Sequence, residues 1–458
     1  MQPLVVKIKK IILLLGDLGI LYLSLYLTLL ISEGAQISAI TWQNHLTPFT
    51  IIYIIWIGIF FINDLYNLNI AQDTQRFTKK FIQSLAINTL IAVGFFYLIP
   101  YFGIAPKTNL AIDIIIFILL AYAWRMIFNA IISRSLFANR ILFLGPQEKF
   151  LDILPDMQRG RYHGWKVVAI WDPNETKEYK RDGIRFFKNT TPLSEAIKQE
   201  RINTIVLGLS ARENKQLARE LYNSIFKNVS VVNLATFYEV VTQRVPAELV
   251  SETWFLENLK ESDKQFHDWT KLTYDYILAI LMAIGFIATL PIIGLIILAD
   301  DGWPIFYSQR RIGKKGKVFR ILKYRTMRRD AERQGALWAT KDDDRITRTG
   351  RFLRKTRLDE LPQVINILKG DMSFIGPRPE RPNFVEELTD MMPFYATRHL
   401  TKPGLTGWAQ INYEYAASFE ENLKKLQYDL YYIKNRTLLL DLKILLKTLG
   451  IVISRKGQ

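Results

Sequence analysis

The sequence predicts a membrane protein that combines α and α/β parts. Three observations lead to this fold class: apolar segments near the N-terminus, a middle region of alternating short strands and helices, and a later apolar segment followed by a basic region. We expect a four-helix transmembrane domain at 1–135, a Rossmann-like parallel-sheet domain at 136–262 and an α-rich domain at 263–458, with a re-entrant membrane helix at 270–299. A chain of 458 residues is long enough for three domains, at about 150 residues each.

The composition fits a membrane protein that handles anions. Hydrophobic residues make up 49% of the chain, yet 60 Lys and Arg face only 43 Asp and Glu, a net charge of +17. Cysteine is absent, which excludes disulfides and thiolate zinc sites. The 4 histidines lie far apart without metal-ligand spacing, so we assign them structural or solvated roles.

Four apolar segments account for the predicted transmembrane domain, because each comes close to the ~20 residues that a membrane span needs. They cover roughly 11–32, 46–62, 81–102 and 110–132. The loop after the first segment, EGAQISAITWQNHL, lacks Lys and Arg, whereas the loop after the second contains DTQRFTKK. The positive-inside rule therefore places both ends of this domain in the cytoplasm. The first apolar run is longer than that of a signal peptide and no cleavage site follows, so we expect it to be retained.

Charged residues fall within or at the edges of these segments, namely Asp17, Asp113 and Arg125. A charge inside the membrane is a functional hypothesis by default. Packing between helices explains the same residues, and the sequence leaves both interpretations open.

The middle region predicts a parallel sheet. The strands ILFLG, WKVVAIW, NTIVLGL and NVSVVNL alternate with helical stretches, the first of which is PQEKFLDILPDMQRG. A dinucleotide-binding domain would carry G-x-G-x-x-G after its first strand, but LGPQEKF has one glycine followed by proline. We therefore favour a structural or regulatory domain over a dinucleotide site.

The apolar stretch at 277–298 is long enough to cross a membrane. Lys and Arg lie on both sides of it, which favours keeping both flanks in the cytoplasm. Pro291 removes one backbone donor and its ring clashes with the carbonyl of Ile287, so it predicts a break that turns the helix back, with Thr289 available to bond the freed carbonyl. A kinked fifth span is the alternative. Two amphipathic stretches near the C-terminus suit either a membrane interface or a soluble core.

A pair of acids, Asp359 and Glu360, stands in a basic region. Residues 301–360 contain eighteen Lys and Arg against eight Asp and Glu. Pro362 and Gly370 predict a short helix with the acids at its N-terminus, where unpaired N–H groups and the helix dipole favour negative charge. As a simple N-cap, Asp359 would need no further role.

The basic residues near this pair favour more than a cap. KYRTM contributes Lys323 and Arg325, GRFLRKTR contributes Arg354, and GPRPE holds Arg378 between prolines. Guanidinium groups bind phosphate in a bidentate manner, and a carboxylate can attack phosphorus to form an acyl phosphate. The set predicts a site for a polyanionic ligand with a nucleophile, and Mg²⁺ held by Asp359 and Glu360 is the natural cofactor.

Four motifs now identify a family resemblance. FRILKYRTM, TRTGRFLRKTRLDELPQVINILKGDMSFIGPRPE, KPGLTGWAQIN and YDLYYIKN…LLLDLKILLKT resemble the bacterial sugar transferase family, the polyprenyl-phosphate sugar-1-phosphate transferases or monotopic phosphoglycosyl transferases. The resemblance covers the chain and is strongest over 305–450. The four spans and the degenerate Rossmann-like domain resemble the large form, as in undecaprenyl-phosphate glucose and galactose phosphotransferases.

The resemblance implies transfer of a sugar 1-phosphate, expected to be a hexose 1-phosphate, from a UDP-sugar to undecaprenyl phosphate with release of UMP. This is a first membrane step of exopolysaccharide, capsule or O-antigen synthesis, on the cytoplasmic face of the bacterial inner membrane. The bilayer is then a partner, and a homodimer is compatible.

The family's residues carry over by position. The nucleophile falls on Asp359 and its acidic neighbour on Glu360. The remaining matches are the phosphate-contacting Lys323, Arg354 and Arg378, a further acid at Asp429 with Asp441 less certain, and the membrane break at Pro291. Arg357 stands where relatives commonly have a small residue, which leaves the sugar preference open.

Rival functions lack their own signatures. A membrane nucleotide-sugar dehydratase should have a glycine-rich dinucleotide loop. A non-enzymatic scaffold for polysaccharide assembly would not need the acids and arginines together. Nucleic acid is not an expected partner, because the basic cluster follows an apolar hairpin. We interpret KDDDR at 341–345 as a solvated loop rather than a metal site.

Overall fold

The computed structural model describes most of the chain. The described residues are 4–34, 37–66, 74–98, 107–132, 139–145, 150, 165–172, 175, 179–181, 183–188, 190–208, 215–225, 229–259, 261, 264–331, 343–413 and 418–453. The chain divides into two compact units, Met1–Val241 and Thr242–Gln458.

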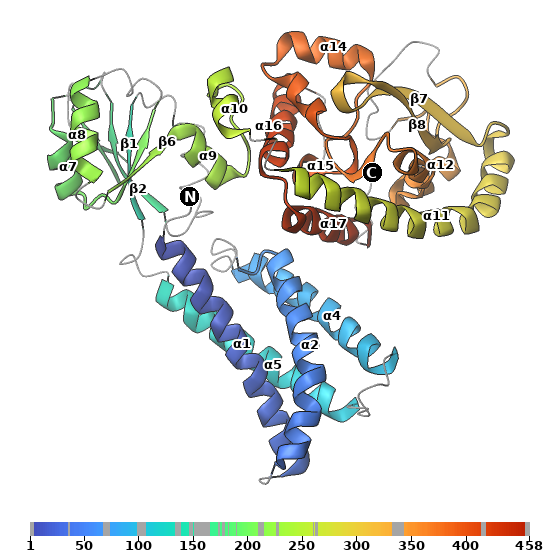
Figure 1. Cartoon of the computed structure of the whole chain (residues 1–458), viewed down its shortest axis with the longest axis horizontal. Coiled ribbons are helices and arrows are strands. Elements are labelled where there is room, and N and C mark those ends of the chain that lie inside the picture. The colour runs from blue at the N-terminus through green and yellow to red at the C-terminus, as the bar shows by residue number, and fades with distance from the viewer. Residues whose placement is uncertain are drawn as a thin grey trace. The chain divides into compact units, whose positions relative to one another are not determined.

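Long apolar helices near the N-terminus are confirmed. They are α1 (Leu4–Glu33), α2 (Ala39–Ile62), α4 (Thr74–Leu98) and α5 (Lys107–Ile132), and all four contain segments long and apolar enough to cross a membrane. In Figure 1, α1 lies beside α5 and α2 beside α4, and these pairs are in contact. Leucines of α1 and aromatic side chains of α2, α4 and α5 form their shared core. A four-helix transmembrane unit remains a prediction.

The charges in these helices are buried and partnered. Arg125 pairs with Asp17 and donates a 2.6 Å hydrogen bond to the Leu65 carbonyl. Asp113 accepts hydrogen bonds from Ser24 at 2.7 Å and from the Tyr53 hydroxyl at 3.0 Å. These bonds join different helices, so they favour packing over a ligand role.

The predicted parallel sheet is also confirmed. Its strands are β1 (Asn139–Leu144), β2 (Trp165–Trp171), β3 (Tyr179–Arg181), β4 (Ile184–Phe187), β5 (Thr204–Leu207) and β6 (Ser230–Asn233). Their order is β3-β4-β2-β1-β5-β6, and only β3 runs antiparallel to its neighbour. Leu142, Leu144 and Ala169 on the strands pack against Leu193, Ala196 and Ile197 of α7 (Leu193–Gln199). The helices α8 (Lys215–Ile225) and α9 (Leu234–Thr242) complete this part. Most of LGPQEKF and the helix predicted after it lie outside the described residues.

The second unit begins earlier than the predicted boundary at 262/263. Val245, Ala247 and Trp254 of α10 (Glu252–Asn258) and its preceding loop pack against Leu426 and Leu430. Burial of these apolar side chains ties 242–259 to the C-terminal unit rather than to the sheet.

The helix α11 (Gln265–Asp301) runs through Pro291 without interruption, which corrects the predicted break. Thr289 donates its hydroxyl hydrogen to the Gly285 and Phe286 carbonyls rather than to Ile287. A straight helix of 37 residues would be ~55 Å long, but the ribbon of α11 turns before it reaches β7 (Figure 1). Pro291 therefore goes with a bend in a continuous helix and not with a break. Whether α11 returns to the same membrane face stays a prediction.

The rest of this unit consists of short mixed elements, several of which pack against one face of α11 (Figure 1). They are the hairpin β7 (Phe306–Ile312) and β8 (Val318–Tyr324) joined by η6 (Lys314–Gly316), α12 (Arg348–Thr356), η7 (Leu358–Gln363), α13 (Val364–Leu368), β9 (Ser373–Ile375), α14 (Pro382–Met391), η8 (Tyr395–Leu400), β10 (Gly404–Thr406), α15 (Trp408–Asn412), α16 (Phe419–Asn435) and α17 (Leu438–Ile453). One face of α16 is buried, as in a soluble core helix. On α17, Leu438, Leu439 and Leu449 stay exposed, which suits a membrane interface.

Candidate active site

The end of β8 and the start of α12 bring basic side chains to one place. Gly350 of α12 lies so close to Thr326 that a Cβ at Gly350 would stand 2.1 Å from the Thr326 carbonyl oxygen. Thr347 caps the helix by accepting the Gly350 N–H at 2.9 Å. The close approach seats Arg354, whose Nε donates to Thr326 Oγ1 at 3.0 Å.

The carboxylate pair follows α12 at a sharp turn. Arg357 ends α12 in the left-handed conformation, at φ 60°, and Asp359 and Glu360 fall in the first turn of the 3-10 segment η7. The predicted helix N-terminus is therefore a 3-10 turn that leads into α13. Gly370, at φ +80°, follows its last residues as a C-terminal stop. Both acids are buried, each 7% exposed.

The two acids have different partners. Glu360 Oε1 accepts from Lys323 Nζ at 3.0 Å and from Arg378 Nη2 at 3.0 Å. Asp359 Oδ1 is buried without a hydrogen-bond partner. The N-cap interpretation of Asp359 is thus not supported, because its Oδ1 accepts nothing. Glu360 is thus held by two cationic side chains, whereas Asp359 has one carboxylate oxygen without a hydrogen-bond partner.

The pKa values of the two acids are shifted in opposite directions. Burial raises the pKa of Asp359 to about 6, and the negative charge of Glu360 adds to the rise. The nearby positive charges oppose this shift without cancelling it. Burial would also raise the pKa of Glu360, but the charges of Lys323 and Arg378 outweigh it and hold that pKa well below its usual range. The cations were expected to act mainly on Asp359; instead, both pair with its neighbour. At neutral pH, Asp359 is nonetheless largely ionised.

A tight backbone crossing fixes the loop that carries Arg378. The strands β9 and β10 pair in parallel, and Gly404 N donates to the Pro377 carbonyl at 2.9 Å. A Cβ on Gly376 would lie 2.3 Å from the Lys402 carbonyl oxygen, and one on Gly404 would lie 2.1 Å from Gly376 N. Only glycine fits these two positions, which explains why the GPRP and KPGLTG motifs occur in one chain.

A second group of ion pairs contacts the loop that carries Arg378, and we call it the outer cluster. Its members are Arg311, Glu380, Arg398, Lys425 and Asp429. Glu380 pairs with Arg311 at 3.3 Å and with Lys425 at 2.5 Å, and Asp429 pairs with Arg398 at 2.8 Å. Arg398 also donates to the Arg378 carbonyl at 3.0 Å. The outer cluster thus supports the backbone of the residue that contacts Glu360.

Two predicted ligand-binding residues have structural partners instead. Asp429 is 1% exposed and its carboxylate is used by Arg398. Arg325 donates to the Asp301 and Gly302 carbonyls and pairs with the Asp301 carboxylate at 3.0 Å, so it caps the end of α11. Helix ends leave carbonyls unpaired, and a buried arginine satisfies them. Neither residue reaches the carboxylate pair through a described contact.

Asp441 belongs to another buried group. It accepts from His267 Nε2 and the Tyr432 hydroxyl, each at 2.8 Å, and also from Tyr274. These bonds join α11 to α16 and α17. A ligand role for Asp441 is not favoured by this arrangement.

The sequence missed Arg398, Glu380 and Arg311 as supports of the site. Glu380 could have been found, since it ends the GPRPE motif. Arg398 lies in YATRHL, which has no chemical signature, and only the fold brings it to Asp429.

The carboxylate pair has a chemistry that fits Mg²⁺. This ion takes one or two carboxylates and completes its shell with water and ligand phosphates. Asp359 Oδ1 is a buried oxygen without a partner, and Glu360 is adjacent. Among the described residues, no group of three His, Cys, Asp or Glu forms a protein-only metal cage.

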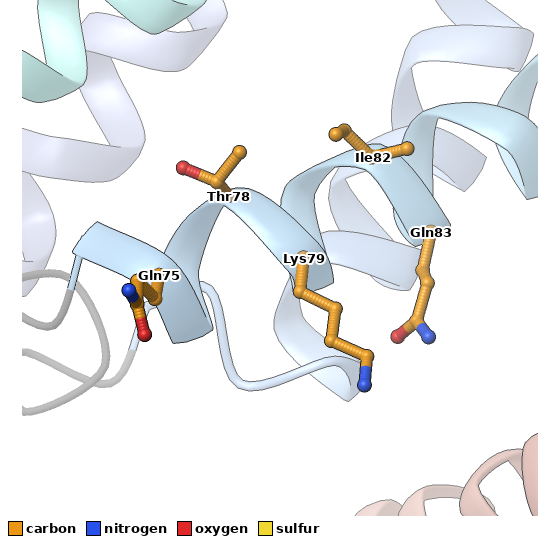
Figure 2. A pocket seen from close by; sticks show the side chains of 5 residues that line it. All are labelled: Gln75, Thr78, Lys79, Ile82 and Gln83. Carbon is orange, nitrogen blue, oxygen red and sulfur yellow. The ribbon is translucent and has the colours of Figure 1, made fainter.

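A large surface hollow elsewhere does not compete with this site. It measures about 570 Å³ and is lined by five residues of α4 alone. Figure 2 shows that Thr78 and Ile82 leave the helix on one side while Lys79 and Gln83 leave on the other. Side chains that diverge in this way do not enclose a ligand.

The fold and the site together define a membrane protein whose C-terminal unit holds a buried acidic pair beside basic side chains. The model of the family described as bacterial sugar transferase matches residues 266–455, which include the whole site. The chain is 45% identical to the uncharacterized sugar transferase EpsL of Bacillus subtilis (strain 168) over 160 residues, 34% of this chain and 73% of that protein. The chain belongs to the bacterial sugar transferase family.

Two further relatives extend the likeness. The UDP-N-acetylgalactosamine-undecaprenyl-phosphate N-acetylgalactosaminephosphotransferase of Aeromonas hydrophila is 36% identical over 239 residues, 52% of this chain and 56% of the relative. The UDP-glucose:undecaprenyl-phosphate glucose-1-phosphate transferase of Xanthomonas campestris pv. campestris is 28% identical over 336 residues, 72% of this chain and 69% of the relative. The chain thus spans about half of the first relative's length and about two thirds of the second's.

Proposed function

We propose that this protein transfers a sugar 1-phosphate from a UDP-sugar to undecaprenyl phosphate through a covalent intermediate on Asp359. The observation that carries the proposal is the unpartnered Asp359 Oδ1, buried beside a Glu360 that already binds two cations. The names of the relatives support the lipid acceptor, since both include undecaprenyl phosphate.

The reaction has two steps at one phosphorus atom. An Asp359 oxygen attacks the β-phosphorus of the UDP-sugar, the bond from that phosphorus to the bridging oxygen breaks, and UMP leaves. A phosphate oxygen of undecaprenyl phosphate then attacks the same phosphorus. The acyl phosphate bond breaks, undecaprenyl-diphosphate sugar forms and the Asp359 carboxylate is restored.

The neighbours of Asp359 have distinct roles in this scheme. Glu360 holds Lys323 and Arg378 beside the nucleophile, where their charges stabilise the transferring phosphoryl group. Arg354 lies close enough to lower the pKa of Asp359, and it adds a third cation. When bound by Asp359 and Glu360, Mg²⁺ supplies further charge neutralisation at the phosphates.

The covalent intermediate is tested with UDP-sugar labelled in the β-phosphate, with Mg²⁺ and without lipid acceptor. The donors are UDP-glucose, UDP-galactose and UDP-N-acetylgalactosamine. We expect up to one UMP per active site and label retained on the protein, which undecaprenyl phosphate then removes into lipid. EDTA should stop UMP release and added Mg²⁺ should restore it. If rapid quenching finds no protein-bound label and UMP forms only with both substrates present, transfer is direct and Asp359 is a base or a metal ligand.

We also propose that the catalytic unit lies on the cytoplasmic face of the bacterial inner membrane. Basic residues on both sides of α11 support this. The chain has no cysteine, so single cysteines at Leu256 and Lys424, exposed positions before and after α11, serve as probes. Both should resist an impermeant thiol reagent in intact cells. Labelling at 424 alone would establish a fifth span.

A further inference from the structure

A small polar pocket lies in the C-terminal unit at the start of α11. Its volume is about 60 Å³, several times the ~10–15 Å³ that one water needs. Its walls come from α11, η6, the loop before β10 and the end of α16, and none of the residues that line it is Asp359, Glu360, Lys323 or Arg378. The pocket is therefore separate from the carboxylate pair.

Four cationic side chains line this pocket, and two of them have carboxylate partners. Lys271 pairs with Asp441 at 3.3 Å, and Arg436 pairs with Glu261 at 2.7 Å. The side chains of Lys314 and Lys402 make no hydrogen bond or ion pair within the described residues. One lysine from η6 and one from the loop before β10 thus line one small space. The charge of Lys314 acts on Asp268, but neither lysine is in a direct ion pair within the described residues.

A buried hydroxyl adds a second observation that points to a ligand. Thr401 is 8% exposed, lines the pocket and has no hydrogen-bond partner for its Oγ1. A buried hydroxyl without a partner costs free energy, because its hydration is lost without replacement. An oxygen-rich ligand in the pocket would accept its hydrogen.

The pocket also contains two acids, and both have partners. Asp268 pairs with Arg436 at 3.2 Å and with His267. Asp275 accepts the Phe374 N–H at 3.1 Å. The groups left to recognise a ligand are therefore two ammonium groups and a hydroxyl, the donor set that binds phosphate oxygens.

The neighbouring surface of α11 indicates where such a phosphate would come from. Phe266 and Trp269, in the first turns of this apolar helix, are 72% and 68% exposed. Exposed aromatic side chains at the end of an apolar helix are typical of the lipid headgroup level. Lys271 and Leu272, which line the pocket, follow these two residues closely along α11.

We propose that this pocket binds the phosphate group of a membrane phospholipid headgroup. Lys314 and Lys402 contact the phosphate oxygens and the Thr401 hydroxyl donates to one of them. Binding there would fix the start of α11 at headgroup depth. Lys402 also immediately precedes the Pro403–Gly404 segment that crosses the Arg378 loop, so the pocket and the carboxylate pair share one backbone support.

The test measures binding of short-chain dihexanoyl phosphatidylglycerol to the full-length protein. The protein is purified in an uncharged detergent and phosphate-free buffer, and binding is followed by isothermal titration calorimetry. We expect saturable binding that weakens at least tenfold in Lys314→Ala/Lys402→Ala and also weakens in Thr401→Val. Lys424→Ala, which removes an exposed lysine outside the pocket, should bind as wild type does. If the double variant is unstable, Lys402→Met keeps the aliphatic stem and tests the charge alone.

Inorganic phosphate, titrated in the same way, separates the two sources of a phosphate group. Weak or no binding of inorganic phosphate, with tight binding of the lipid, supports the headgroup. Equal affinity for both, with full competition, overturns the lipid source and assigns a soluble phosphate. Wild-type affinity for the lipid in Lys402→Met and the double variant overturns the site itself.

Discussion

The carboxylate pair and the outer cluster are two buried groups of acids and bases in the same unit, and they differ in one respect. In the outer cluster each acid is matched: Glu380 has Arg311 and Lys425, and Asp429 has Arg398. In the pair, Glu360 is bonded to Lys323 and Arg378, and Asp359 Oδ1 is left without a partner. Within these two groups, Asp359 is therefore the acid that has a buried oxygen without a partner, although all four acids are buried.

The difference has an energetic consequence. A buried, matched ion pair loses stability when one partner is removed, because the other charge stays buried and uncompensated. A buried carboxylate with a raised pKa destabilises the fold whenever it is ionised, so its removal should have the opposite effect. The pKa of Glu380 in the outer cluster is shifted the other way, so mutations of Asp359 and of Glu380 should move stability in opposite directions.

The largest expected effect is that of Asp359→Asn. The substitution keeps the size and removes the proposed nucleophile, so UMP release should fall by at least about a thousandfold. The folded pKa of about 6 exceeds the unfolded value of about 3.9. Protonation of Asp359 therefore stabilises the folded state. This stabilisation is complete below about pH 4 and is lost as the pH rises through about 6. The variant should therefore melt at a higher temperature than wild type at pH 8, and the difference should shrink toward pH 4. A lower melting temperature at pH 8 would contradict the comparison.

In the outer cluster, Glu380→Gln should lower both stability and activity. Burial would raise the pKa of Glu380, but the charges of Lys425, Arg398 and Arg311 outweigh burial and lower that pKa to about 2, so the ionised carboxylate stabilises the fold. Without it, Arg311 and Lys425 lose their carboxylate partner, a loss of up to about 3–5 kcal/mol. Melting temperature and UMP release report the two effects. The matched control is Glu380→Gln/Lys425→Met, which removes both charges of one pair and should recover part of the stability. Unchanged stability in Glu380→Gln would contradict the comparison.

A smaller effect is expected for Glu360→Gln. The side chain keeps its size, but Lys323 and Arg378 lose a carboxylate partner. Burial lowers the pKa of Lys323 and the Glu360 charge opposes that shift. Without the charge, Lys323 should lose its proton at lower pH, so the alkaline limb of the rate profile should move to lower pH. An unchanged alkaline limb with a reduced rate would show that Lys323 does not act through its charge.

The sequence predicts those features of the structure that depend on residues close together in the chain. Apolar length predicted the long helices, strand alternation predicted the parallel sheet, and Gly370 predicted a helix end. The pairing of Lys323 and Arg378 with Glu360 rather than Asp359 could not be predicted, because two adjacent acids have the same sequence neighbours. Arg325 and Asp429 were given ligand roles because their motifs are basic or acidic. Their partners, the end of α11 and Arg398, are distant in sequence and become neighbours only in the fold.

The smallest effect concerns Arg357, which the sequence marked as unusual. It adopts φ 60° at the end of α12, a conformation that costs a residue with Cβ roughly 1–2 kcal/mol and glycine little. Its charge also lowers the pKa of Asp359. Arg357→Gly should therefore relieve strain and raise the pKa of Asp359 further, moving the acid limb of the rate profile to higher pH. We expect the rate to fall about two- to threefold at pH 6 and to change little at pH 8, where Asp359 is ionised in both proteins. Arg357→Lys retains both the positive charge and the strained Cβ, so its acid limb should match that of wild type. If Arg357→Lys and Arg357→Gly shift the acid limb of the rate profile equally, the effect comes from lost contacts of the guanidinium group. The charge of Arg357 would then not act on Asp359.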